Sequence, residues 1–313
     1  MAKKKGKQKQ SAFRNYIRVL WGIFLLGVTG IIVLFGGAAL GIFGPMPDLQ
    51  QLENPRTNLA TQIISSDGTI LGKYYFDDNR TPIGFDEIPT DMVEALIATE
   101  DERFYDHAGI DWRGTLRAFV FLGKRGGAST ITQQLARQIF VGVRSRNVLK
   151  TIFQKAQEWV IAVQLEQRYT KKEIMAMYLN KYDFGYQADG IRSAAKIFFN
   201  KTPQELSIEE SATLVGMLKN SSLFNPIRRP ERVKERRNIV FQQMVRNQRI
   251  TEQEKDSLAQ LPIEITFTPE SHREGLATYF RAHLKEFMDE WIDANPKPNM
   301  CVCARVRVCV CMY

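Results

Sequence analysis

The sequence predicts a mainly α-helical domain behind a single membrane-spanning helix, with a small β hairpin between the two. Three observations carry this prediction. Residues 19–46 contain no charged side chain. An Asp-Gly pair between two apolar runs marks a tight turn near residue 67. Beyond residue 89, Ser or Thr is repeatedly followed three residues later by Glu, which is the capping-box pattern of helix starts.

The apolar stretch at 19–46 is long enough to cross a bilayer, which takes roughly 20 residues. It is longer than the core of a cleaved signal peptide, which has about 7–15 residues, so we expect an uncleaved anchor. Residues 1–18 carry seven Lys or Arg and no acid. The positive-inside rule therefore places this tail in the cytoplasm and the main domain outside. We expect a single-pass protein of the cytoplasmic (inner) membrane with an extracytoplasmic, periplasmic main domain.

The net charge of +9 does not indicate a nucleic-acid partner. The basic tail supplies seven of these charges, which leaves +2 for the remainder. The excess thus lies next to the membrane anchor and does not form a basic groove on the folded domain.

Residues 47–88 are expected to hold a polar linker followed by the hairpin. Its strands, Thr61–Ser65 and residues 69–76, flank Ser66-Asp67-Gly68, where Gly accepts the positive φ that a tight turn needs. Residues 89–255 are expected to form the helical domain. Its four capping boxes are Thr170 with Glu173, Thr202 with Glu205, Ser207 with Glu210, and Thr251 with Glu254.

The last thirteen residues, 301–313, contain all four cysteines. Paired Cys-x-Cys can bind metal or form disulfides. However, alternating Cys and Val is what a thymine–guanine repeat encodes, so we interpret this tail as non-native read-through. Before it, residues 271–293 show the apolar spacing of one more amphipathic helix, followed by a Pro-rich segment.

Five ordered segments lie between Glu100 and Phe241. Their characteristic residues are Glu100, Asp101, Phe104, His107 and Gly109; Gly127 to Leu135; Lys155 and Glu158; Lys171, Ile174, Tyr178, Leu179 and Asn180; and Arg236, Arg237 and Val240. In order and spacing these segments resemble the motifs of family 51 peptidoglycan glycosyltransferases, which form the N-terminal part of class A (bifunctional, type 1A-like) penicillin-binding proteins. The third segment departs from the pattern, because Gln154 stands where the family has Arg.

The resemblance implies a lysozyme-like, mainly α domain that polymerises lipid II into glycan strands by inverting transfer, with release of undecaprenyl pyrophosphate. It makes Glu100 the general base and Glu158 the second carboxylate. Taken alone, Glu100-Asp101-Glu102 would be interpreted as a solvated acidic cap. The substrate-binding residues that the resemblance implies are Asp101, Phe104, His107, Ser129, Thr130, Gln133, Gln134, Arg137, Lys155 and Arg237. Of these, His107 and Phe104 are expected to act mainly through hydrogen bonding and packing.

The chemistry of these residue types agrees with that assignment. Extending a glycan needs a base for the acceptor hydroxyl and cations for the departing pyrophosphate. Ser129 and Thr130 are expected at a helix start, where free backbone N–H groups favour an anion. Gln154 cannot supply the charge of an Arg, and Arg137 or Arg144 is expected to compensate.

No cage of metal ligands is visible in the sequence. A Mg²⁺ ion held by Asp101 or Glu158 together with phosphate oxygens remains an option, since Mg²⁺ prefers a few carboxylates plus substrate phosphates. The expected partners are lipid II, the growing glycan chain and the membrane, and cell-wall assembly proteins are left open. Apolar residues between 112 and 122 are interpreted as a surface that dips into the bilayer, with a buried core helix as the alternative.

Two other functions remain open at this point. A peptidoglycan-cleaving glycosidase would also use two carboxylates, with water as the acceptor. An inactive membrane-anchored cell-wall scaffold is the second alternative, suggested by Gln154 and the unusual terminus. Residues 256–300 are interpreted as the start of a linker toward a transpeptidase domain that truncation has removed.

Overall fold

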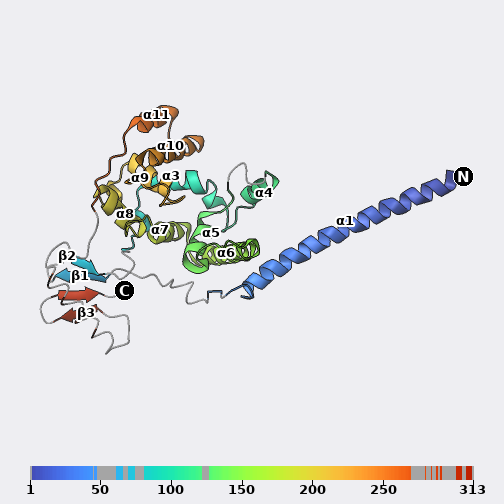
Figure 1. The fold of residues 1–313 in the computed structure, drawn as a ribbon, viewed down its shortest axis with the longest axis horizontal. Coiled ribbons are helices and arrows are strands. Elements are labelled where there is room, and N and C mark those ends of the chain that lie inside the picture. Colours follow the sequence, from blue (N-terminus) through green and yellow to red (C-terminus); the bar gives the residue numbers. More distant parts are fainter. Residues whose placement is uncertain are drawn as a thin grey trace.

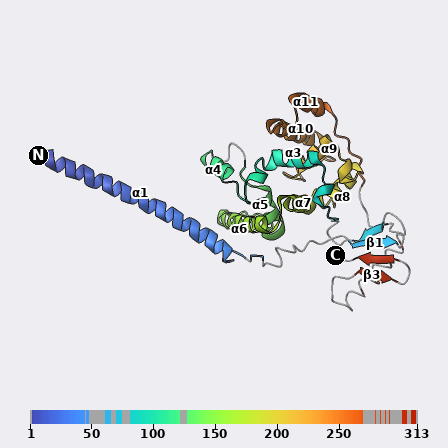
Figure 2. The same cartoon turned by 180° about the vertical axis from the view of Figure 1, so that it is seen from behind.

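The computed structural model describes residues 2–44, 46–47, 61–65, 70–74, 81–121, 127–268, 301–304 and 308–311, with four single residues between 279 and 290. This part of the chain is mainly helical, which confirms the predicted class. A long first helix projects from a body of packed helices (Figure 1), and the view from behind agrees (Figure 2). The α-helices are α1 (Ala2–Ala39), α3 (Thr90–Glu100), α4 (Trp112–Val120), α5 (Ile131–Ala136), α6 (Val148–Arg168), α7 (Lys171–Lys181), α8 (Gly190–Phe199), α9 (Ile208–Met217), α10 (Pro230–Arg246) and α11 (Glu252–Gln260). The shorter segments are the 3₁₀ turns η1 (Phe85–Glu87), η2 (Phe104–Asp106) and η4 (Pro203–Glu205) and the π-helical η3 (Arg137–Val141).

The first helix differs from the predicted anchor at both ends. α1 already begins at Ala2, so the basic tail continues the helix, and it ends at Ala39, before the predicted boundary at residue 46. Gly41 has a φ of 74°, a left-handed value that glycine adopts without strain and that commonly ends a helix. Beyond it, Phe43 stacks on Phe153 of α6 with ring centroids 4.2 Å apart. Of the helices that the structure describes, α1 alone is long and apolar enough to cross a membrane, over residues 14–39.

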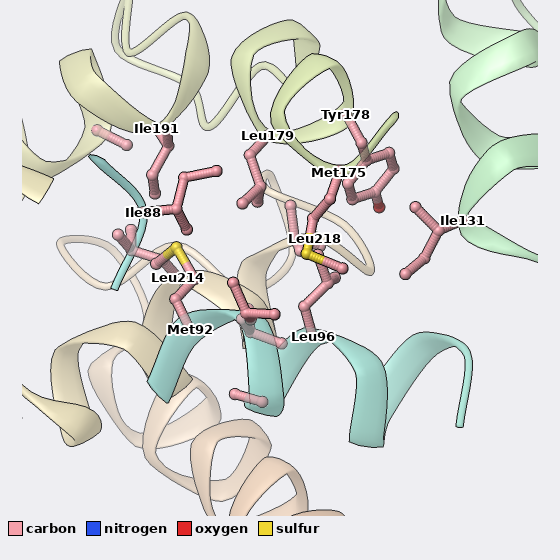
Figure 3. Packing of buried hydrophobic residues seen from close by; sticks show 14 of the residues in the cluster. Ile88, Met92, Leu96, Ile131, Met175, Tyr178, Leu179, Ile191, Leu214 and Leu218 are labelled. Carbon is pink, nitrogen blue, oxygen red and sulfur yellow. The ribbon is translucent and has the colours of Figure 1, made fainter. Parts of the chain in front are cut away.

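A buried core holds the helices of the body together around α3. Met92 and Leu96 are fully buried on α3 and meet Leu214 from α9 and Met175 and Leu179 from α7 (Figure 3). Each such side chain contributes about 1.5–3 kcal/mol through removal of its apolar surface from water. α3 therefore presents its last residue, Glu100, from a rigid support.

All four predicted capping boxes form. In each, the glutamate accepts the backbone N–H of the cap residue. At Thr170 and Thr251 the cap hydroxyl also accepts the backbone N–H three residues on. The box at Thr202 opens a single 3₁₀ turn, with Pro203 at its first position. Local hydrogen bonding therefore sets the starts of η4, α7, α9 and α11.

A small sheet has the strand order β2-β1-β4-β3, with β1 (Thr61–Ser65), β2 (Ile70–Tyr74), β3 (Cys301–Ala304) and β4 (Val308–Cys311). β1 pairs antiparallel with both β2 and β4. The predicted turn at Ser66-Asp67-Gly68 lies outside the described residues. So does the predicted helix at 271–293, apart from four single positions.

Candidate active site

Glu100 is the last residue of α3, and its carboxylate lies among polar side chains from three other helices. Its Oε2 atom accepts a hydrogen bond from Gln134 Nε2 on α5 at 2.9 Å. Its Oε1 atom lies 3.7 Å from Arg236 Nη2 on α10. Tyr178 of α7 donates its hydroxyl proton to Gln134 Oε1 at 3.0 Å. The Glu100 side chain keeps 17% of its surface exposed, so it is anchored and still accessible.

Two tyrosines, the buried Tyr178 and the half-buried Tyr182, lie near this carboxylate. Burial raises the pKa of Tyr178 well above its ordinary value, and the negative charge of Glu100 adds to the effect. Burial likewise raises the pKa of Tyr182 to about 12. Both phenols therefore keep their protons at neutral pH, and Tyr178 acts as the donor that orients Gln134.

The sequence predicted Arg237 at the site, but the structure places its neighbour Arg236 there. Arg237 is 1% exposed and turns away, donating from Nη2 to the carbonyl of Leu261 at 2.6 Å and from Nη1 to that of Pro262 at 3.2 Å. It thereby links the end of α11 and the residues that follow to α10. α11 itself runs to Gln260, past the domain boundary predicted at residue 255. Adjacent residues of a helix point in directions about 100° apart, so only one of the two can face Glu100.

Asp101, the neighbour of Glu100, connects three elements of the fold. It is buried, and its carboxylate contacts His107 Nε2 at 3.1 Å and accepts from the backbone N–H of Ile131 at 3.0 Å. Gln133 donates its own backbone N–H to the hydroxyl of Thr130, the N-cap of α5. The expectation of free N–H groups for an anion at this helix start is therefore wrong for Ile131 and Gln133, because Asp101 and Thr130 occupy them.

Gly109 lets the first two motifs approach each other. Its carbonyl accepts from Thr130 Oγ1 at 2.8 Å and from Gln133 Nε2 at 3.2 Å. Its φ is 85°, and a Cβ there would lie 2.9 Å from the backbone of Ala162 on α6. A glycine is required at this contact on both counts.

Phe104 and His107 lie behind the site and have structural surroundings. Phe104 is fully buried, and Lys171 Nζ lies 4.4 Å from the centre of its ring. Lys171 also donates to the carbonyl of His107 at 2.6 Å. Both residues are therefore engaged within the protein, Phe104 by packing and His107 by hydrogen bonding.

The second carboxylate, Glu158 on α6, is 2% exposed and paired with two cations. Lys155 Nζ lies 2.8 Å from its Oε2 atom, and Arg144 Nη2 lies 3.6 Å from its Oε1 atom. Lys155 also donates to Ser129 Oγ at 3.0 Å and to Gln133 Oε1 at 2.9 Å. Ser129, Gln133, Lys155 and Glu158 therefore form one connected polar cluster.

Burial lowers the pKa of Lys155, and the positive charges of Arg144 and Arg137 lower it further. Glu158 opposes this shift through its charge and hydrogen bond. Arg137, the first residue of η3, therefore belongs to the same cationic neighbourhood. No three His, Cys, Asp or Glu residues of the described chain lie together as metal ligands.

Two adjacent glutamines on α5 connect the two carboxylates. Gln134 binds Glu100 directly. Gln133 binds Lys155, which in turn binds Glu158. The site thus has an accessible carboxylate on one side and a cationic cluster around a buried carboxylate on the other.

Sequence reasoning missed Arg236 and Tyr178 as parts of the site. Both lie in matched motifs, so the signal was present in the sequence. What the motifs do not contain is the direction in which each side chain points. Arg144 was named only as one of two compensating cations, and it is the one that contacts Glu158.

An apolar surface extends from the site toward the end of α1. Trp112, Leu116 and Phe119 of α4 are exposed, Phe119 to 80%. Trp112 packs edge-on against Trp159 of α6, and Phe35 of α1 stacks on the same indole. The apolar face of α4 is therefore exposed and continuous with the membrane-length helix, so the alternative of a buried core helix is wrong.

Comparison with known proteins gives consistent matches. A family model described as transglycosylase matches residues 67–245. Penicillin-binding protein 1A of Escherichia coli K12 is 39% identical over 241 residues, which cover 74% of this chain and 28% of that protein. Penicillin-binding protein 1A/1B of Bacillus subtilis 168 is 33% identical over 308 residues, which cover 95% of this chain and 32% of that protein. A crystal structure of penicillin-binding protein 1A from Haemophilus influenzae matches 77% of this chain and 25% of its own, with 23% identity and a TM-score of 0.41. The chain spans about a third or less of the length of these relatives.

Proposed function

The chain belongs to the transglycosylase family, as found in class A penicillin-binding proteins, and from this membership we propose that it is a peptidoglycan glycosyltransferase. In this proposal it polymerises lipid II into glycan strands by inverting transfer and releases undecaprenyl pyrophosphate. The observation that carries the proposal is the pairing of one accessible carboxylate, Glu100, with a separate cationic cluster around Glu158.

Each side of the site has one task in the transfer. Glu100 takes the proton of the acceptor hydroxyl as its oxygen bonds to the anomeric carbon of the donor. The bond from that carbon to the pyrophosphate breaks, and its electron pair leaves with the pyrophosphate. Lys155, Arg144 and Arg137 stabilise the negative charge that develops there. Gln134 and Arg236 keep Glu100 in position.

The position of the site relative to the apolar surface supports a lipid-linked substrate. The exposed face of α4 and the end of α1 meet at Trp159. A protein anchored by α1 would hold this face against the bilayer, where the polyprenyl tail of the substrate resides. With the basic tail on the cytoplasmic side, the domain lies outside the cytoplasmic membrane. Cell-wall assembly proteins remain proposed partners only.

A Mg²⁺ ion is not needed to give Asp101 and Glu158 partners. Asp101 is engaged by His107 and Ile131, and Glu158 by Lys155 and Arg144. These contacts leave the carboxylates poorly placed to serve as ligands, so the proposal assigns the pyrophosphate to the cationic side chains.

The direct test supplies purified protein with lipid II in one reaction and with mature glycan in another. We expect lipid II to be consumed and glycan strands to form, with no release of soluble sugars from mature glycan. Release of sugars without consumption of lipid II would establish the glycosidase instead. Inactivity on both, in a folded protein, would favour the scaffold.

The lowered pKa of Lys155 predicts the alkaline side of the pH profile. The charged amine is the form that stabilises the leaving group, and burial makes it lose its proton at a lower pH than an ordinary lysine. The rate should therefore begin to fall at a lower pH than the one at which an ordinary lysine loses its proton. A Lys155→Arg variant keeps its charge, so we expect its alkaline limb in kcat/KM to move to higher pH, whatever its absolute rate. An unchanged limb would assign the titration to another group.

A further inference from the structure

The loop between η3 and α6, residues 142–147, folds back onto the first turns of α6. Val143 in this loop is 93% exposed, so apolar packing does not hold it at that point. The loop is held by hydrogen bonds instead. Thr151 Oγ1 donates to the carbonyl of Ser145 at 2.9 Å, and Asn147 caps α6.

Gln154 of α6 also binds the loop, through both the oxygen and the nitrogen of its side-chain amide. Its Oε1 atom accepts the backbone N–H of Ser145 at 2.9 Å. Its Nε2 atom donates to the carbonyl of Val143 at 3.1 Å. These two hydrogen bonds hold the residues before and after Arg144, so they fix the backbone at Arg144.

Arg144 then reaches the pyrophosphate side of the site. Its Nη2 atom lies 3.6 Å from Glu158 Oε1, while 47% of its side chain remains exposed. Its charge also acts on Lys155. A long side chain on an otherwise exposed loop would lose much of this alignment if the loop were free to move.

We propose that Gln154 is a positioning residue whose amide holds Arg144 in the cationic cluster. This rests on the proposed function. An amide is suited to the task because it offers one acceptor and two donors, whereas Arg offers only donors and Glu only acceptors. The departure from the family pattern at residue 154 is then no loss of charge at the site, because the cation comes from the neighbouring loop. It follows that restoring Arg at this position harms the enzyme.

The kinetic test uses Gln154→Leu, Gln154→Arg and Arg144→Ala, with the Gln154→Leu/Arg144→Ala double variant, assayed on lipid II. We expect Gln154→Leu and Gln154→Arg each to lower kcat by about 10-fold to 100-fold, the scale of a misplaced catalytic contact. KM should change less, because the charge on the leaving group grows in the transition state. The double variant should be no slower than Arg144→Ala, since Gln154 acts through Arg144.

Gln167→Leu is the matched control, because Gln167 is an exposed glutamine on the same helix. It should retain wild-type activity and thermal stability. A Gln154→Arg variant as active as the wild type would overturn the proposal. So would multiplicative losses in the double variant, which would mean that Gln154 acts independently of Arg144.

Hydrogen exchange separates this proposal from the proposed function. The Ser145 amide should exchange faster in Gln154→Leu and at the wild-type rate in Gln167→Leu, and both can be measured without any activity. Unchanged exchange would overturn the positioning role. If the wild-type protein were inactive but exchange were faster in Gln154→Leu, the glycosyltransferase assignment would be wrong, while the contact between Gln154 and the loop would be confirmed.

Discussion

Glu100→Gln is expected to abolish glycan polymerisation, with a loss of about 10²–10⁴-fold, the contribution of a positioned general base. The amide keeps the shape of the side chain and can still accept the hydrogen bond from Gln134. It cannot take a proton from the acceptor hydroxyl. Polymer formation from lipid II, followed over time at a saturating concentration, measures the loss.

The neighbouring acid provides the control for this variant. Glu102 is exposed and pairs with Arg103 and Arg117, away from Gln134 and Arg236. Glu102→Gln should therefore remain close to wild-type activity, and both variants should keep the wild-type helical circular dichroism. Full activity in a folded Glu100→Gln protein would remove Glu100 from the role of base.

Alanine substitutions of the two adjacent arginines of α10 are expected to have opposite effects, one lowering stability and the other lowering activity. Arg237→Ala removes a side chain that is 1% exposed, together with its hydrogen bonds to the carbonyls of Leu261 and Pro262. We expect a loss of about 2–4 kcal/mol in the free energy of unfolding, seen as a fall in Tm of about 4–16 °C for a domain of this size. Protein that remains folded at low temperature should keep its specific activity.

Arg236→Ala should show the reverse pattern. Its guanidinium lies beside Glu100, so we expect a loss of about 10²-fold in rate with little change in Tm. Thermal unfolding by circular dichroism and polymerisation on lipid II, measured on the same preparations, make the comparison. If Arg237→Ala lost activity while keeping its Tm, the sequence-based placement of Arg237 at the site would be right after all.

The helical class and several helix starts could be predicted because their causes are local. A Ser or Thr and a Glu three residues later satisfy the first N–H groups of a helix without help from the rest of the chain, as at Thr170 and Thr251. The end of α1 was harder to predict. The apolar run continues to residue 46, but Gly41 ends the helix and Phe43 packs on α6.

The directions in which individual side chains point could not be predicted from the sequence. The motif contains both Arg236 and Arg237, and only the packing of α10 against α3 and α11 decides which one faces Glu100. Asp101 illustrates the same limit. It follows Glu100 in the sequence, yet its carboxylate binds His107 and the start of α5.

Gln154 is the position where the sequence and the structure lead to different expectations. As a departure from a motif, it suggests a missing cation. In the structure its amide binds residues 143 and 145, and Arg144 between them lies near Glu158. A contact between a helix and the loop that precedes it has no pattern that sequence spacing alone would reveal.

The central claim is that this site joins sugars as it releases a lipid pyrophosphate. The most direct measurement counts, in one reaction with lipid II, the new glycosidic linkages and the undecaprenyl pyrophosphate released, and determines the anomeric configuration of each linkage. We predict one pyrophosphate per linkage and a configuration opposite to that of the donor. Retained configuration, or pyrophosphate released without new linkages, would contradict the account.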